Sequence, residues 1–178
     1  TALGAFSITG DRVEANLGDG SGVRVNDTDS ADDILLNGRG ISKTIDVAID
    51  DSAKNVAAKI NEVSGETGVT AAAKTYALLS SERAVDETVS LFINGTRTGD
   101  FVFSKSNVTD AISKINAVSG QTGVTASATT DSKIRLYASD GSDMLIENAD
   151  QSSTSMRVQT MGHDGSSVMP AKVWHRAV

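Results

Sequence analysis

The residue types most often used in catalysis are scarce in this sequence and gather near its end. His163 and His175 are the two histidines, and Asp164 and Ser166 lie close to the first of them. A hydrolase triad needs a histidine that the fold holds between an acid and a nucleophile, and neighbours within one loop do not supply that geometry. We therefore interpret this segment as a surface loop without a catalytic residue.

Acidic residues occur in two places where they could assist a reaction or bind a metal. Asp140 and Asp143 could form a carboxylate pair for acid–base chemistry, but a turn between two strands explains them more simply. The run Asp27–Asp33, D-T-D-S-A-D-D, spaces its oxygens like a calcium loop, yet it lacks the central glycine and closing glutamate of an EF-hand. We interpret it as a solvated acidic loop. The sequence thus predicts no catalytic, cofactor-binding or metal-binding residue, and we expect that the protein is not an enzyme.

Composition narrows the class of protein further. The 178 residues include no cysteine, which excludes disulfides, thiolate catalysis and cysteine-based zinc sites. The net charge of −7 argues against nucleic acid or an anionic membrane surface as a partner. No apolar run approaches the ~20 residues of a membrane span. Because the start, Thr1-Ala2-Leu3-Gly4, is neither a signal peptide nor an initiator methionine, we expect the chain to be a fragment of a longer protein.

One stretch of twelve residues occurs twice. Ile60–Ala71 reads I-N-E-V-S-G-E-T-G-V-T-A and Ile115–Ala126 reads I-N-A-V-S-G-Q-T-G-V-T-A, with ten identical positions and an offset of 55 residues. Identity at that level indicates an internal duplication. A duplicated stretch must belong to a repeated structural unit, so it shows how the chain is organised.

Each copy has the pattern of a helix that ends and turns into a strand. Apolar residues at helical spacing form one stripe in each copy: Ala53, Val56, Ala57, Ile60 and Val63 in the first, and Val108, Ala111, Ile112, Ile115 and Val118 in the second. The stripes predict amphipathic helices over 52–64 and 107–119. One face of each helix should be buried.

The ends of the two helices carry matching signals. N-cap pairs stand at equivalent positions, Ser52 with Asn55 and Asn107 with Asp110. Gly65 and Gly120 follow the stripes where a left-handed C-cap residue is expected. Gly68 and Gly123 then release the chain into strands rich in Val, Thr and Ala.

Strands around the repeats are predicted from alternating apolar residues and turn signals. The clearest hairpin has the turn Asn37-Gly38-Arg39-Gly40 between strands Ile34–Leu36 and Ile41–Ile49. Further strands are expected at 5–8, 12–16, 23–25, 69–74, 76–80, 89–93, 101–103, 124–129, 134–138, 144–147 and 156–161. Gly162–Ser167 is expected to be a loop.

The chain divides into four segments on this pattern. Residues 1–30 hold N-terminal strands, 31–85 the first repeat unit, 86–150 the second, and 151–178 C-terminal strands and a tail. The polar link Ser81–Glu87 marks the boundary between the units. The predicted fold class is α+β: two related units, each with one amphipathic helix packed on a small, mostly antiparallel sheet, and extra strands at both ends. The pattern leaves open whether the tail pairs back with the N-terminal strands.

The repeat and its surroundings resemble the repeated motif in the outer, variable part of bacterial flagellins. The similarity covers Leu36–Ser80 and Leu91–Asn148, including the Asn37-Gly38 and Asn94-Gly95 turns ahead of the helices and the strand I-R-L-Y-A-S-D-G-S-D at Ile134–Asp143. The opening L-G-A-F-S-I-T-G-D-R-V, Leu3–Val13, resembles the point where the helical core of flagellin passes into its outer domains.

The resemblance implies a fragment of a flagellin outer domain that carries two hook/IN-type repeats. Such a protein is structural: it builds the extracellular filament that propels the cell, and it is exported through the flagellar secretion apparatus. Its partners are other flagellin subunits, bound mainly through helical core segments outside this sequence, and exposed Ser or Thr can carry O-linked sugars. We expect the isolated chain to be monomeric, with no cofactor.

Three alternatives remain at this point. A filament-capping or hook-associated protein carries the same repeats, although the opening Leu3–Val13 favours flagellin. An adhesive module for mucin, a surface or phage would need a broad exposed apolar patch. An enzyme inserted into the variable region would need a metal or nucleophile constellation, which the sequence lacks.

Overall fold

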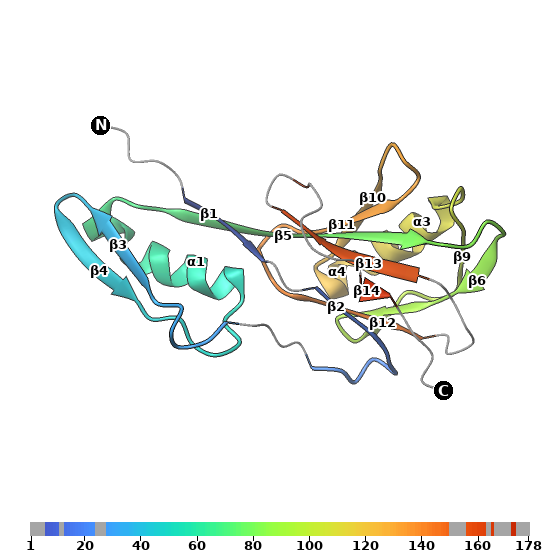
Figure 1. Cartoon of the computed structure of the whole chain (residues 1–178), viewed down its shortest axis with the longest axis horizontal. Helices are drawn as coiled ribbons and strands as arrows, with labels where there is room; N and C mark the ends of the chain where they lie inside the picture. Colours follow the sequence, from blue (N-terminus) through green and yellow to red (C-terminus); the bar gives the residue numbers. More distant parts are fainter. Residues whose placement is uncertain are drawn as a thin grey trace.

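The computed structural model of the chain describes residues 6–10, 13–23, 28–149, 156–162, 165 and 172–173. They form an elongated molecule with a smaller and a larger lobe along its long axis (Figure 1). The helices are α1 (Ala53–Glu62), α2 (Ser64–Thr67), α3 (Thr109–Ala117) and α4 (Ser119–Thr122). The strands are β1 (Phe6–Gly10), β2 (Val13–Leu17), β3 (Ile34–Gly38), β4 (Ile41–Ile45), β5 (Ala71–Ser81), β6 (Glu87–Val89), β7 (Leu91–Ile93), β8 (Thr96–Arg97), β9 (Phe101–Phe103), β10 (Thr125–Ala128), β11 (Ile134–Ala138), β12 (Met144–Asn148), β13 (Met156–Met161) and β14 (Lys172–Val173).

The smaller lobe is the β3–β4 hairpin packed against α1. Its core is five buried side chains from these elements and the segment after β4: Leu36, Ile45, Val47, Val56 and Ile60. The hairpin is confirmed, but its turn differs from the prediction. Arg39 and Gly40 have φ values of 49° and 77°, so they are the central residues of the turn, whereas Asn37 and Gly38 belong to β3.

β5 joins the two lobes as one strand of eleven residues (Figure 1). The prediction of two separate strands, 69–74 and 76–80, is therefore wrong. Near its start, β5 pairs in parallel with β1, with Phe6 opposite Ala71. Toward its end it pairs antiparallel with β11 on one side and β13 on the other. Because both ends of β5 have partners, the strand continues across the junction without a turn.

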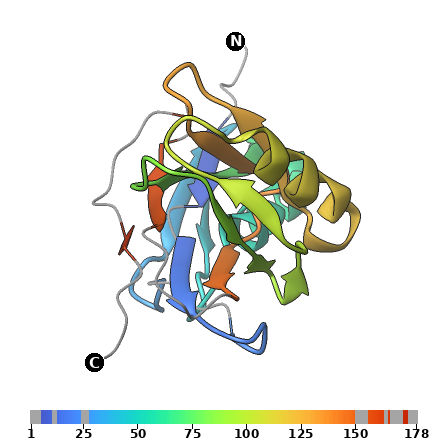
Figure 2. The same cartoon turned by 90° about the vertical axis from the view of Figure 1, so that its right-hand side faces the viewer.

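The larger lobe is built from two larger sheets, the two-stranded β6–β9 sheet and the helices α3 and α4. One sheet has the order β10-β11-β5-β13-β14 with β1 added beside β5, and the other has the order β2-β12-β7-β8. Figure 2, which faces this lobe, shows α3 and α4 along one side of the strands. The core contains residues of both sheets, of α3 and of the β6–β9 pair, including Phe101 and Phe103. Residues 89–93 do not form one strand as predicted, because Ser90 separates β6 from β7.

The lobes touch where α1 meets the turn between β11 and β12. The N–H of Lys54 donates to the carbonyl of Gly141 at 3.1 Å, and Lys54 Nζ lies 2.7 Å from Asp140 Oδ2. Gly141 has a φ of +75°, and a Cβ there would lie 2.2 Å from the Cβ of Ala73. A glycine is thus required twice over at this junction, for its backbone angle and for its size.

The predicted fold class is confirmed: the described residues form a mixed α+β structure with small, mostly antiparallel sheets and strands toward both ends. Two details differ from the sequence prediction, and one question that it left open has an answer. Val23 is not in a strand, and residues 24–27 lie outside the described residues. β4 ends at Ile45, and Ile49 is 72% exposed and not part of the alternating pattern. Of the tail, β14 pairs with β13. The division into four segments stays a prediction.

Candidate functional site

The structure describes some of the catalytic candidates predicted from the sequence but not all of them. His163, Asp164, Ser166 and His175 lie outside the described residues. Within the described part of the chain, no group of three or more His, Cys, Asp or Glu side chains is arranged to hold a metal ion.

Asp140 forms an ion pair with Lys54. Burial raises the pKa of its carboxyl, but hydrogen bonds from Lys54 and Ser142 outweigh that effect and lower the pKa to about 2. The backbone N–H of Ser142 donates to Asp140 Oδ1 at 3.0 Å. A carboxyl that stays ionised and paired is poorly suited to donate a proton. The prediction of a turn between strands is confirmed for this residue, which lies between β11 and β12.

The acidic loop uses its carboxylates to bind backbone groups. Asp29 Oδ1 accepts the N–H of Ala31 at 2.6 Å, and Asp32 Oδ2 accepts the N–H of Asp29 at 3.0 Å. Asp33 Oδ1 accepts the N–H of Val47 at 2.9 Å. Asp27 lies outside the described residues. These bonds fix the turn before β3, which is the local role that short acidic side chains commonly have in loops.

The repeated stretch is where the structure concentrates equivalent contacts. Ile60 and Ile115 are both fully buried, at 0% exposure, so the predicted helix stripes are confirmed. Each helix packs its stripe against the strand that follows the motif and against neighbouring strands. The stripe fixes the helix on its sheet, and the polar residues of the motif then close the junction.

The asparagine after each isoleucine closes the edge of the following strand. Asn61 Nδ2 donates to the carbonyl of Ala71 at 2.9 Å, and Asn61 Oδ1 accepts the N–H of the same residue at 2.9 Å. Asn116 makes the same two bonds with Ala126, at 3.0 and 2.8 Å. The amide therefore takes the place that a neighbouring strand would occupy, and it satisfies backbone groups that an open strand edge leaves unpaired. We call this pair of bonds the asparagine clamp.

Two hydrogen bonds made by hydroxyl groups of the motif are also the same in both copies. Ser64 Oγ donates to the carbonyl of Asn61 at 2.6 Å, and Ser119 Oγ donates to that of Asn116 at 2.8 Å. The first threonine of each copy is buried, and its Oγ1 accepts the backbone N–H two residues later: Val69 to Thr67 at 3.2 Å and Val124 to Thr122 at 3.1 Å. These bonds hold the short helical turns α2 and α4 between the main helix and the strand.

The glycines of the motif have roles other than those predicted. Gly65 and Gly120 are not left-handed C-caps: each lies inside the short helix after the stripe, α2 or α4, because the chain makes one more turn before leaving. Gly68 and Gly123 are the left-handed caps, with φ of 70° and 71°. The prediction was three residues early because the sequence does not show this extra turn.

The starts of the two helices are not equivalent. Ser52 is the N-cap of α1 as predicted, and its side chain accepts the N–H of Asn55. The prediction for Asn107 is wrong: α3 starts after Val108 without a side-chain cap. Asn107 Nδ2 instead donates to Asp86 at 3.0 Å, and Asp110 accepts the N–H of Val102 in β9 at 2.8 Å. Both side chains thus bond to groups outside α3 and do not cap the helix.

Sequence reasoning missed two asparagine roles. It assigned no role to the side chains of Asn61 and Asn116, although an identical polar residue at an exposed helix position in both copies was a usable signal. It assigned Asn94 only to a turn, which is confirmed by the φ values of 50° and 81° at Asn94 and Gly95. The side chain of Asn94 also donates to the carbonyl of Thr122 at 2.8 Å and accepts the N–H of Leu145 at 3.0 Å.

The comparisons with known proteins identify the repeated unit. The flagellin hook IN motif matches residues 33–79 and 104–140, so each match contains one helix, its clamp and the strand that follows. No curated protein matches this chain with significance. None of the helices in the described residues is long and apolar enough to cross a membrane. This chain therefore carries two flagellin hook IN motifs, which support a flagellin-type protein of the bacterial flagellar filament.

Proposed function

We propose that this chain is the outer, solvent-facing part of a flagellin and decorates the filament of a swimming bacterium. The observation that supports this role is how the motif helices use their apolar faces. The longest helix of the described residues, α1, has ten residues and buries its stripe against its own lobe. α3 likewise buries Ala111 and Ile115 in the larger core. Helices occupied in this way cannot polymerise a filament through those faces.

The surface and composition are consistent with that position. A chain with a net charge of −7 resists association in water. A chain without cysteine can pass an export channel unfolded with no risk of disulfides. In this proposal the protein catalyses no reaction, contacts other subunits mainly through segments outside this sequence, is monomeric as an isolated chain, and offers exposed Ser and Thr to O-linked sugars.

We also propose that the predicted segments have separate roles. Residues 31–85 and 86–150 act as the two motif-bearing units, and residues 1–30 and 151–178 lead toward the filament core. The two matched ranges, 33–79 and 104–140, fall within the proposed units.

Site-directed labelling of intact filaments tests the outer position. Because the sequence has no cysteine, Val85→Cys introduces a single reactive thiol at a side chain that is 68% exposed. Val89→Cys is the matched control, since the same change four residues later falls at a side chain that is only 2% exposed. Each change is made in the full-length protein, and the filaments are treated with a maleimide dye.

The position of the dye decides between the candidate functions. We expect the Val85→Cys filaments to be labelled along their whole length and the Val89→Cys filaments to stay dark. Labelling confined to the filament tip would contradict the proposal in favour of a capping protein, and labelling confined to the hook junction would favour a hook-associated protein. Filaments that react only after dissociation would place the residue at a subunit contact and overturn the outer position.

A further inference from the structure

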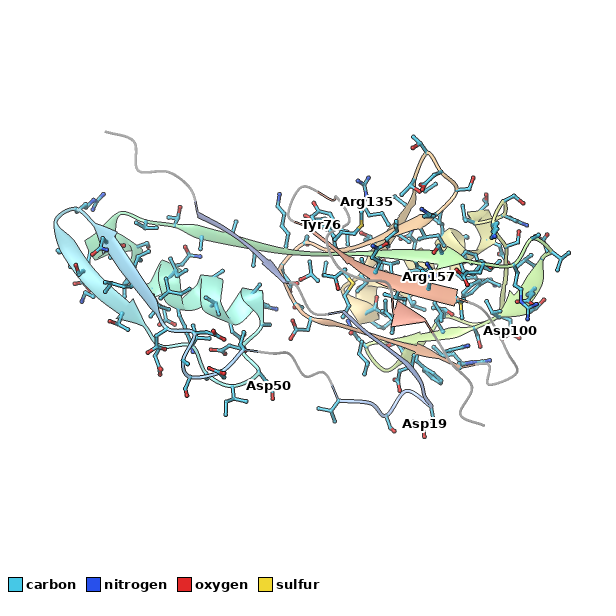
Figure 3. The ribbon with its side chains drawn as sticks, viewed as in Figure 1. Asp19, Asp50, Tyr76, Asp100, Arg135 and Arg157 are labelled. Atoms are coloured by element: carbon cyan, nitrogen blue, oxygen red, sulfur yellow. The ribbon has the colours of Figure 1, made fainter. Side chains whose placement is uncertain are left out.

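The larger lobe has a polar pocket of about 340 Å³ on the outer face of its main sheet. Its floor comes from two neighbouring strands, where Leu78 in β5 stands opposite Gln159 in β13 and Ser80 stands opposite Arg157. Leu78 is 8% exposed and supplies an apolar patch. Arg157 extends from β13 in the larger lobe (Figure 3). The volume lies at the lower end of the range for small-molecule sites, which suits a single sugar-sized ring.

Two further segments complete the wall of the pocket. The turn between β10 and β11 contributes Asp131, Ser132 and Lys133. The segment between β9 and α3 contributes Lys105, whose backbone N–H donates to the carbonyl of Arg83 at 2.8 Å. Because the strands and this backbone bond hold the wall segments, the charged groups stand around a preformed space.

The charges of the pocket do not cancel. Arg157 pairs with Glu82, and Lys133 pairs with Asp131 at 2.6 Å. Lys105 has no ion pair among the described residues and is exposed. Arg157 Nε is buried and has no hydrogen-bond partner in the described part of the chain. In a protein with a net charge of −7, the described residues that line this pocket thus include three cations and two carboxylates.

This combination favours one class of ligand. A phosphate or sulfate, with a charge of about −2, would be attracted by Lys105, but Glu82 and Asp131 would repel it more strongly than a single carboxylate. A neutral sugar could bond to the hydroxyls and carboxylates but would leave Lys105 without a partner. A hydroxylated ring with one carboxylate satisfies both requirements: its carboxylate pairs with Lys105, and its hydroxyls donate to Glu82 or Asp131 and accept from the Arg157 guanidinium.

We propose that the pocket between β5, β13 and the β10–β11 turn binds an acidic sugar, a hydroxylated ring that carries one carboxylate. This inference is independent of the filament role, because it rests on the pocket alone. No aromatic side chain is among the described residues that line the pocket, so the ring has no stacking platform. We therefore expect weak binding, with a dissociation constant on the order of 1 mM for a single sugar.

Nuclear magnetic resonance titration of the whole chain with sodium glucuronate tests the proposal. Glucose and sodium phosphate are titrated in parallel, since the first lacks the carboxylate and the second lacks the ring. Lys105→Gln removes the unpaired cation without breaking an ion pair, and Lys105→Arg restores the charge. Lys114→Gln, an exposed lysine of α3 outside the pocket, is the matched control. Thermal melting confirms that each variant is folded.

We expect saturable amide shifts with glucuronate at 80–82, 105, 131–133 and 157–159, and at least tenfold weaker binding of glucose and phosphate. Lys105→Gln should weaken glucuronate binding at least fivefold, whereas Lys105→Arg and Lys114→Gln should bind like the parent. The proposal is overturned if no saturable shifts appear at the pocket up to roughly 20 mM glucuronate. It is also overturned if phosphate or glucose binds as tightly, or if Lys105→Gln binds like the parent.

Discussion

The two copies of the motif share the buried isoleucine and the asparagine contact, but they pack against cores of very different size. In both, an isoleucine at 0% exposure anchors the helix and an asparagine closes the edge of the next strand. Among the described residues, the first copy packs on two clusters of five and three buried apolar residues, whereas the second packs on one cluster of nineteen. The motif thus determines how a helix joins a strand, and its surroundings determine how much apolar surface that junction buries.

The difference extends to the strands that follow. β10, after the second copy, has four residues and ends in a hairpin, whereas β5, after the first, has eleven and enters the larger lobe. Val124 is fully buried and Val69 only half-buried, although they are the same motif position. We infer that the smaller lobe is the less stable part and that it depends on β5 and on the contact with the β11–β12 turn.

Placing a charge in each helix stripe should have the largest effect and should separate the lobes. A lone buried carboxylate costs roughly 3–5 kcal/mol, so Ile115→Asp should unfold the larger lobe. Ile60→Asp should unfold the smaller lobe and leave the larger one folded, because the larger core contains no residue of α1. Circular dichroism melting and NMR would show this. Loss of both lobes in Ile60→Asp would mean that the two cores unfold as one.

Removing the asparagine clamps should cost less and should also distinguish the copies. Asn116→Ala leaves the backbone groups of a buried Ala126 unpaired, with an expected loss of roughly 1–3 kcal/mol. Asn61→Ala should cost about half as much, because Ala71 is half-buried and water can replace the amide. Denaturant unfolding measures both, with Ser113→Ala on an exposed position of α3 as the control for helix propensity. Equal and negligible losses would contradict the role of the clamp.

The glycines of the motif allow a test within one copy. Gly123→Ala should cost about 1 kcal/mol or more because of its φ of 71°, and nothing lies within 4 Å of an added Cβ, so the loss is conformational. Gly120→Ala should be neutral or stabilise by up to about 1 kcal/mol, because it lies in α4 with similar open space. Thermal melting should show a lower midpoint for Gly123→Ala and an unchanged or higher midpoint for Gly120→Ala. A larger loss at Gly120 would restore the C-cap assignment there.

The ion pair between the lobes should have the smallest effect and a defined pH dependence. The pKa of Asp140 is lowered to about 2, so its contribution is present above the unfolded value near 3.9 and is lost as pH falls from there toward 2. Because Asp140 and Lys54 are about half exposed, the contribution is at most about 0.5 kcal/mol. Asp140→Asn should be less stable than the parent at pH 5 and equal to it near pH 2.

Asp100→Asn, which removes a pair with Arg97 three residues away, is the matched control for that measurement. Because it removes no contact between the lobes, Asp100→Asn should leave the stability of the smaller lobe unchanged at pH 5. If Asp140→Asn shows the same stability difference from the parent at pH 5 and pH 2, the pair with Lys54 does not contribute to docking.

The parts predicted correctly from sequence depend on neighbours along the chain. Helical spacing identified the burial of Ile60 and Ile115, and the Asn94-Gly95 turn was recognised from two residues. The repeat is evident from the identity of the two twelve-residue stretches alone. A hydrophobic stripe and a turn carry their physical reason within a few residues, which is why the α+β class could be inferred.

The incorrect predictions concern residues whose conformation or hydrogen bonds depend on segments distant in the sequence. Asn107 has the right type and spacing for an N-cap, but Asp86, twenty-one residues earlier, takes its amide. β5 looked like two strands because nothing local shows that β1 and β13 extend its pairing. The clamp was missed for the same reason, since Asn61 and Ala71 become neighbours only after the helix has folded onto the strand.

Residue-by-residue native amide exchange of the intact chain tests the central claim most directly, namely that one junction is built twice on cores of unequal size. We predict that the amides of Ala71 and Ala126 are both protected, and that α1 and the β3–β4 hairpin open at a lower free energy than α3 and β11. Unprotected amides at Ala71 and Ala126, or equal opening free energies in the two lobes, would contradict it.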